Sequence, residues 1–246
     1  MKKIFAILMT LAILSLCSVS AFAAPATADG TVYDLVANFA DLSDTCFSFG
    51  ARAKADGTMY TTSTFHDGTD DAIKSATHEK AMVGYRVNDI GGARVDVFYS
   101  ADDTAKVIKW YPNSAYENVI IFTAPVAGTY SYNFHTTGIW DFAHTSTRYY
   151  VEAAGEIKNE ILCPKGTGKD VPTAMTGTVT LKAGDTIYLV YDPEDSASGD
   201  NSKLNAATVT LVEASAAPAT SDAAVSIAVA IATAAIVGLA VVVKKH

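Results

Sequence analysis

The stretch Tyr130-Ser131-Tyr132-Asn133-Phe134 alternates aromatic with small polar side chains. Successive side chains of an extended strand point to opposite faces, so this stretch predicts a strand with one buried aromatic face and one polar face. The same period of two recurs over residues 179–181, 187–191 and 209–211. The chain is therefore expected to consist of strands that turn their apolar faces toward a common core.

Short β-prone runs separated by turn signals fill residues 31–212. Asp56-Gly57 stands between two such runs, and the stretch 88–92, Asn-Asp-Ile-Gly-Gly, stands between another two. Clusters of Asn, Asp and Gly are typical of hairpin turns. No segment of this part shows a convincing amphipathic helix pattern. We expect an all-β fold, a single β-sandwich or jelly roll over residues 31–212.

Two strings carry a resemblance to known modules. Residues 122–130 read F-T-A-P-V-A-G-T-Y, and residues 179–188 read V-T-L-K-A-G-D-T-I-Y. This pair of strings resembles the jelly-roll, carbohydrate-binding-like modules of bacterial surface proteins. The resemblance covers about half of the predicted domain and concerns turns and strands, so it implies the fold more than a ligand.

Residues 1–23 have the layout of a secretory signal peptide. A basic start is followed by an apolar run over residues 4–16, and Ala21-Phe22-Ala23 supplies the small residues of a cleavage site. Lipidation of Cys17 is the alternative, which Leu16 argues against because the usual residue before a lipidated cysteine is small. We predict cleavage after Ala23, followed by a flexible leader over residues 24–30.

Residues 223–243 form an apolar run without a charge, and residues 244–246 form a short basic end. A helix of this length spans roughly 31 Å, about the hydrocarbon thickness of a bilayer. We predict a transmembrane helix over 223–243, with the basic tail 244–246 in the cytoplasm.

The linker at residues 213–222 contains Pro218, Thr220 and Ser221. Together with the apolar helix and the basic end, it resembles the cell-wall sorting signal of Gram-positive surface proteins, which usually reads Leu-Pro-x-Thr-Gly. The resemblance implies a sortase that cleaves after Thr220 and joins Thr220 to peptidoglycan. Ala217 replaces Leu and Ser221 replaces Gly in this pattern. The alternative is a polar linker ahead of a permanent membrane anchor.

The charge balance excludes one class of partner. The chain holds 18 Lys and Arg against 26 Asp and Glu. All the acidic residues lie outside the signal peptide and the membrane segment, so the exported domain is more acidic than the whole chain. Nucleic-acid binding needs clustered basic residues and is not expected. Cys46 and Cys163 remain after maturation, and the sequence alone leaves a disulfide between them open.

We expect no cofactor, but two groups of residues could each bind a metal ion as an alternative. The first is a run of oxygen ligands of the kind that Ca²⁺ prefers: Asp192, Glu194, Asp195 and Asp200. Its alternative is a solvated acidic turn. The second is His135, Asp141 and His144, which could bind zinc but lack an evident fourth ligand, and packed or solvated histidines are the better explanation.

The stretch from Phe134 to Tyr150 mixes an aromatic platform with polar groups. It contains the residues that we expect to contact a sugar: Trp140, His135, Asp141, His144 and Arg148. The other aromatic residues nearby, such as Trp110 and Tyr149, are expected to fill the core for the most part.

No nucleophile motif and no assignable carboxylate pair are present, so the chain is expected not to be an enzyme. We predict a glycan-binding or adhesion module held at the cell surface. The alternatives are a structural component of the cell envelope, such as a minor pilus or wall-associated subunit, and a hydrolase. The expected partners are a sortase, peptidoglycan, a glycan ligand and, through residues 223–243, the membrane.

Overall fold

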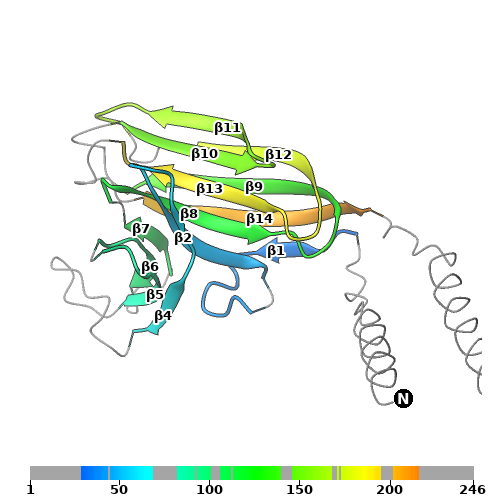
Figure 1. The fold of residues 1–246 in the computed structure, drawn as a ribbon, viewed down its shortest axis with the longest axis horizontal. Helices are drawn as coiled ribbons and strands as arrows, with labels where there is room; N and C mark the ends of the chain where they lie inside the picture. Colours follow the sequence, from blue (N-terminus) through cyan, green and yellow to red (C-terminus); the bar gives the residue numbers. More distant parts are fainter. Residues whose placement is uncertain are drawn as a thin grey trace, which may run out of the picture.

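The computed structural model describes residues 29–43, 45–68, 82–91, 93–100, 106–111, 113–139, 146–167, 171, 173–194 and 202–215. Their regular elements are all strands, arranged in two sheets (Figure 1). The predicted all-β sandwich is confirmed. Within the described residues no helix is long and apolar enough to cross a membrane. The predicted signal peptide, the sorting residues and the segment 223–243 lie outside them.

Sheet A has eight strands, which pair antiparallel. Its order is β12 (Thr173–Leu181), β9 (Gly128–Gly138), β14 (Ser202–Ala214), β7 (Ile108–Tyr111), β6 (Asp96–Ser100), β5 (Met82–Val87) and β4 (Ser63–Asp67), while β1 (Val32–Asp34) also pairs with β14. The last strand thus ends two residues past the predicted domain boundary.

Sheet B has six strands, also antiparallel. Its order is β11 (Glu156–Cys163), β10 (Thr147–Ala153), β13 (Thr186–Asp192), β8 (Tyr116–Thr123), β2 (Phe47–Ala53) and β3 (Met59–Tyr60). Both predicted hairpins form, β2–β3 around Gly57 and β5–β6 around Gly91. These two glycines have φ of +74° and +63°, the left-handed region that suits glycine.

The core between the sheets is aromatic, as the alternation at residues 130–134 predicts. Tyr130, Tyr132 and Phe134 are at most 4% exposed. Trp110 from sheet A is fully buried and packs edge-on against Tyr191 from sheet B, with ring centroids 5.5 Å apart. These rings therefore join the two layers, and the expectation that Trp110 fills the core is correct.

Cys46 and Cys163 are not joined by a disulfide. The strand register explains why. Cys163 pairs with Thr147 at the start of β10. Cys46 directly precedes β2 and lies at the opposite end of the sheet, level with Ala153, the last residue of β10. The step from Thr147 to Ala153 spans about 20 Å at 3.3 Å per residue. A disulfide needs Cα atoms within about 7 Å of each other.

Candidate functional site

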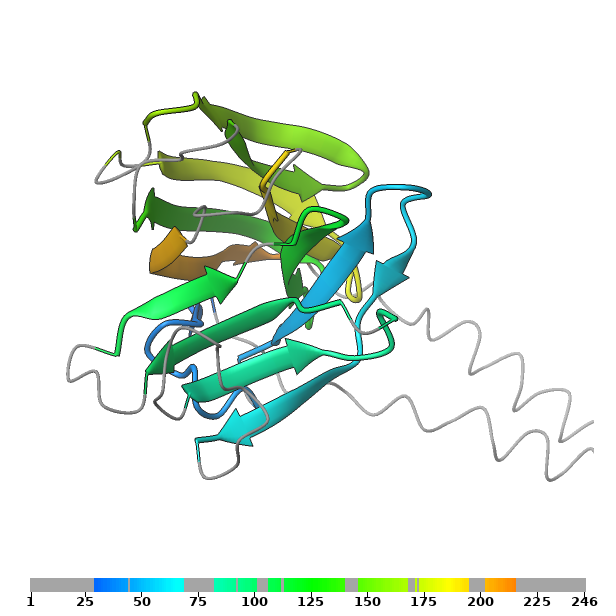
Figure 2. The same ribbon diagram turned by 90° about the vertical axis from the view of Figure 1, so that its left-hand side faces the viewer.

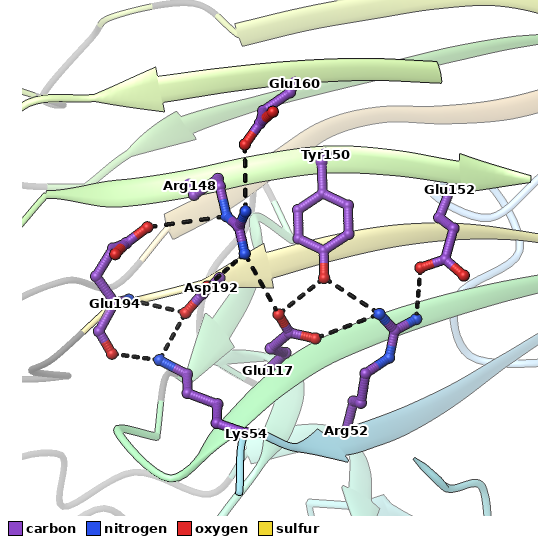
Figure 3. A network of polar contacts seen from close by, with 9 residues as sticks. All are labelled: Arg52, Lys54, Glu117, Arg148, Tyr150, Glu152, Glu160, Asp192 and Glu194. Atoms are coloured by element: carbon purple, nitrogen blue, oxygen red, sulfur yellow. Dashed lines mark hydrogen bonds and ion pairs between the residues drawn. The ribbon is translucent and has the colours of Figure 1, made fainter. Parts of the chain in front are cut away.

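The outer face of sheet B carries a continuous network of charged side chains (Figure 3). It arises from strand alternation, because residues such as Tyr149 and Val151 of β10 face the core and their neighbours face outward. Strands β2, β8, β10, β11 and β13, or the residues just after them, contribute to it. We call it the sheet B network, and its nine members are Arg52, Lys54, Glu117, Arg148, Tyr150, Glu152, Glu160, Asp192 and Glu194.

Tyr150 lies at the centre of one half of the network. Its hydroxyl donates a hydrogen bond to Glu117 Oε1 at 2.8 Å and accepts one from Arg52 Nη1 at 3.2 Å. Arg52 also forms an ion pair with Glu152 at 2.9 Å. Its guanidinium lies 5.7 Å from the centre of the Tyr188 ring. Arg52 of β2, which also pairs with Glu117 at 3.5 Å, therefore links two carboxylates and two tyrosines from three other strands.

Asp192 lies at the centre of the other half. Lys54 Nζ approaches Asp192 Oδ1 to 2.6 Å, and Arg148 Nη2 donates to Asp192 Oδ2 at 3.1 Å. Arg148 also donates to Glu160 at 3.2 Å. The backbone N–H of Glu194 donates to Asp192 Oδ1 at 2.9 Å, and Lys54 donates to the Glu194 carbonyl. Both oxygens of Asp192 are thus engaged by cations.

An apolar layer supports the network. Val119, Ile121 and Val190 are at most 5% exposed although they face away from the main core, and the Tyr150 ring packs with them. The guanidinium of Arg148 stacks 4.8 Å from the centre of that ring. Charged groups held against apolar side chains interact more strongly than in open water.

This burial changes the ionisation of two members. Desolvation raises the pKa of Glu117, although the hydrogen bond from Tyr150 and the nearby Arg52 act in the opposite direction. Desolvation, followed by the carboxylate of Glu117, raises the pKa of Tyr150 well above its ordinary value. Tyr150 therefore stays a protonated phenol and a hydrogen-bond donor throughout the physiological pH range.

A surface depression of about 430 Å³ adjoins the Tyr150 half of the network. It lies where the β10–β11 turn meets the β12–β13 turn. The side chains that line it include Glu152, Asp185, Thr186 and Tyr188. Asp185 accepts a hydrogen bond from the backbone of Lys182, which fixes its turn. The depression thus combines one partly exposed aromatic ring with carboxylate and hydroxyl groups.

The residues predicted to contact a sugar do not all come together. Arg148 is part of the sheet B network, whereas His135 points outward from sheet A, because its β9 neighbours Phe134 and Thr136 face the core. These two side chains therefore lie on opposite faces of the sandwich. Trp140, Asp141 and His144 lie outside the described residues.

The predicted calcium ligands Asp192 and Glu194 lie together, but in an environment of cations. Asp192 is paired with Lys54 and Arg148, and Glu194 Oε1 lies 3.8 Å from Arg148 Nε. In the described part of the chain no three His, Cys, Asp or Glu side chains are grouped so as to hold a metal ion. Asp195 and Asp200 lie outside that part, so the calcium site stays a prediction, as does the zinc alternative.

Sequence reasoning missed Arg52, Glu117 and the depression beside Tyr188. A usable signal was present at residues 148–152, which read Arg-Tyr-Tyr-Val-Glu and place Arg148, Tyr150 and Glu152 on one strand face. Their partners on β2 and β8 could not be named, because the order of strands in a sheet is not written in local periodicity.

Comparisons with known proteins place the chain near carbohydrate-binding modules in structure. The CBM22-1 xylan-binding domain of Paenibacillus barcinonensis Xyn10C is 12% identical and aligns over 77% of this chain and 100% of its own, with a TM-score of 0.36. The CBM35 of Cellvibrio japonicus Abf62 is 12% identical over 48% and 83% of the two chains, with a TM-score of 0.32.

A third structure is similar at the same level. The C-terminal CBM6 of the laminarinase LamC from Zobellia galactanivorans is 20% identical over 47% of this chain and 87% of its own, with a TM-score of 0.29. No protein-family model and no curated protein matches the chain. Similarities at these scores do not identify a ligand, so a function has to be inferred from the site.

Proposed function

We propose that the chain is a non-catalytic glycan-binding protein displayed at the bacterial cell surface. The observation that carries the proposal is the depression beside Tyr188, where a partly exposed ring adjoins Glu152, Asp185 and Thr186. A sugar offers a flat apolar face and a rim of hydroxyl groups. An aromatic ring suits the face, and carboxylate and hydroxyl groups suit the rim.

The sheet B network supports this role by fixing the wall of the depression. Glu152 is held by Arg52, which also lies against the Tyr188 ring. Arg52 is in turn fixed by Tyr150 and Glu117. A ligand therefore meets groups that are already ordered, which reduces the entropy lost on binding.

The network is less suited to hydrolysis of a sugar. Glu117 has a raised pKa, the property required of a general acid. However, it is only 7% exposed, and its Oε1 accepts the hydrogen of Tyr150. A catalytic acid needs a proton directed at the substrate. The carboxylate of Glu117 instead serves to hold Tyr150 and Arg52.

The test is a glycan array on the full-length chain, followed by calorimetry with each glycan that binds. Tyr188→Ala should abolish binding, whereas Phe65→Ala, which removes a partly exposed ring from the edge of sheet A, should leave it unchanged. Circular dichroism must show that both variants are folded. Trp140→Ala tests the predicted loop platform separately. The proposal is wrong if no glycan binds, or if Tyr188→Ala binds as well as wild type.

We also propose attachment to the cell wall through the linker at residues 213–222. The support is the sequence pattern of Pro218, Thr220 and Ser221 ahead of the apolar run. In wild-type cells, wall digestion should release the protein joined to wall fragments, and Thr220→Ala should remain with the membrane. Release of both proteins in the same form would show that sorting does not occur.

A further inference from the structure

The depression beside Tyr188 is lined by acidic and uncharged residues. It lies at the turn between β10 and β11, and Figure 2 shows these two strands, coloured yellow-green, along one edge of the sandwich. Of the described residues around it, two are acidic and none is basic: Glu152, Ala153, Ala154, Gly155, Gly184, Asp185, Thr186 and Tyr188. A ligand that enters the depression therefore meets negative charge.

Three of these side chains lie on the same outer face of sheet B. The register pairs Glu152 of β10 with Tyr188 of β13. Directly opposite residues in an antiparallel pair have Cβ atoms about 4.5–5.5 Å apart. Thr186 lies two residues before Tyr188 on β13, so its side chain points to the same face. A carboxylate, an aromatic ring and a hydroxyl group are thus close enough together to contact neighbouring units of one glycan.

Asp185 adds a second carboxylate whose charge is not balanced by a neighbour. It is partly exposed in the β12–β13 turn, and its Oδ2 accepts a hydrogen bond from the Lys182 backbone N–H at 2.8 Å. Within the described residues no cation forms an ion pair with it. The turn therefore fixes the position of this carboxylate and leaves its charge available to a ligand.

The cation that adjoins the depression, Arg52, is already engaged by the protein. It forms ion pairs with Glu152 at 2.9 Å and with Glu117 at 3.5 Å, and its Nη1 donates a hydrogen bond to the Tyr150 hydroxyl at 3.2 Å (Figure 3). One arginine between two carboxylates leaves an excess of negative charge. An anionic sugar would meet this excess without a free cation to bind, which argues against uronic acids and phosphorylated sugars as ligands.

Ala154 keeps part of the depression open. Its φ is +54°, in the left-handed region where Gly, Asn and Asp are the usual residues. Alanine is less favourable for the turn than these residues, but it has a small side chain, and a longer one would occupy the depression. A departure from local preference of this kind is expected where a position serves binding.

We propose that the depression binds a glycan through a protonated amino group, as carried by amino sugar units that are not N-acetylated. This inference rests on the glycan-binding function proposed above and adds the charge of the ligand. The ammonium group of the sugar lies near Asp185 and Glu152, and the sugar ring lies on Tyr188. A cation is also attracted to the face of an aromatic ring, so the ring and the carboxylates favour the same ligand.

The test is calorimetry of the full-length chain with tetrasaccharides that share a β-1,4-linked backbone and differ only at C2 of each unit. The glucosamine tetramer carries an ammonium group there, cellotetraose a hydroxyl group and the N-acetylglucosamine tetramer an acetamide group. Two partly exposed ion pairs should make the glucosamine tetramer bind about tenfold more tightly than cellotetraose. This preference should shrink as salt rises from about 50 to about 500 mM.

Asp185→Asn removes the charge and keeps an acceptor for the Lys182 N–H. It should bind the glucosamine tetramer about fivefold more weakly than wild type does and should bind cellotetraose normally. Asp56→Asn is the matched control, because Asp56 likewise accepts a hydrogen bond from a backbone N–H in its turn, that of Thr58 at 2.9 Å. Asp56 lies at the other end of sheet B, so its replacement should change neither affinity.

Ala154→Asn separates the place of binding from the fold. Its longer side chain should weaken binding of each tetrasaccharide that wild type binds, while the melting temperature stays the same or rises, because Asn is favoured at positive φ. Normal binding by this variant would show that the depression is not the site. The proposal is also overturned if Asp185→Asn binds the glucosamine tetramer as tightly as wild type does. Equal binding of the glucosamine tetramer and cellotetraose would refute only the selection for charge and leave the glycan-binding function intact, whereas no binding of any glycan would refute both.

Discussion

The hydroxyl of Tyr150 is the most informative single group to remove. Tyr150→Phe keeps the ring, which is 3% exposed and packs on the apolar layer, and it keeps the stacking with Arg148. It deletes the hydrogen bond donated to Glu117 at 2.8 Å and the one accepted from Arg52 at 3.2 Å. The measured effect therefore belongs to the hydroxyl.

The expected loss of stability is about 2 kcal/mol. A hydrogen bond to a charged group contributes about 1.5–3 kcal/mol, and the Glu117 carboxylate loses its nearest donor in a poorly hydrated place. For a domain of this size that corresponds to a fall in melting temperature of roughly 4–8 °C. Urea denaturation followed by tryptophan fluorescence gives the free energy of unfolding directly.

Tyr116→Phe is the matched control. The Tyr116 hydroxyl donates to the neutral Ile90 carbonyl at 3.4 Å, near the limit for a hydrogen bond. Its loss should cost about 0.5 kcal/mol or less. Combining Tyr150→Phe with Glu117→Gln should give a coupling free energy of about 1 kcal/mol. If Tyr150→Phe is no less stable than Tyr116→Phe, the polar contacts around Tyr150 do not hold this face together.

Three further outcomes follow from the structure. Because burial raises the pKa of Glu117, the folded protein binds the proton of this carboxyl group more tightly than the unfolded chain does. The contribution of Glu117 to stability therefore falls as the pH rises above the pKa of the unfolded state. Glu117→Gln should remove this part of the pH dependence, measured by urea unfolding between about pH 4 and pH 8. Gly84→Ala should destabilise by more than about 2 kcal/mol in the same assay, because a Cβ would lie 2.2 Å from the Val97 carbonyl oxygen, and a smaller loss would mean that the strands can separate. A reducing agent should leave the melting temperature unchanged, because Cys46 and Cys163 are not bonded, whereas a drop would reveal a bridge.

Local features of the fold were accessible from the sequence because they depend on neighbours along the chain. The alternation at Tyr130, Tyr132 and Phe134 correctly predicts a buried aromatic face, and Asp56-Gly57 correctly predicts a hairpin. Both follow from the geometry of an extended strand and from the freedom of glycine at positive φ.

The candidate site was less accessible because it depends on strand order. The sequence predicts a sugar contact for Arg148 because this residue lies near Trp140 in the chain, but the contacts of Arg148 include Asp192 from β13 and Glu160 from β11. Glu117 and Arg52 lie 65 residues apart in the chain and meet only because β8 pairs with β2. Local propensity does not encode such pairings, and a register shift of one residue would place these side chains in the core.

The position of β14 determines how the domain would respond to being pulled. Its last residue, Ala214, pairs with Gly128 at the start of β9, and the strand is flanked by β9 on one side and by β1 and β7 on the other. Tension applied to the chain beyond residue 215 therefore acts along the axis of β14. Antiparallel hydrogen bonds are perpendicular to the strand, so such tension strains many of them at once instead of opening them one after another. A domain tethered through this strand would resist mechanical extraction far better than one tethered through the edge strand β4.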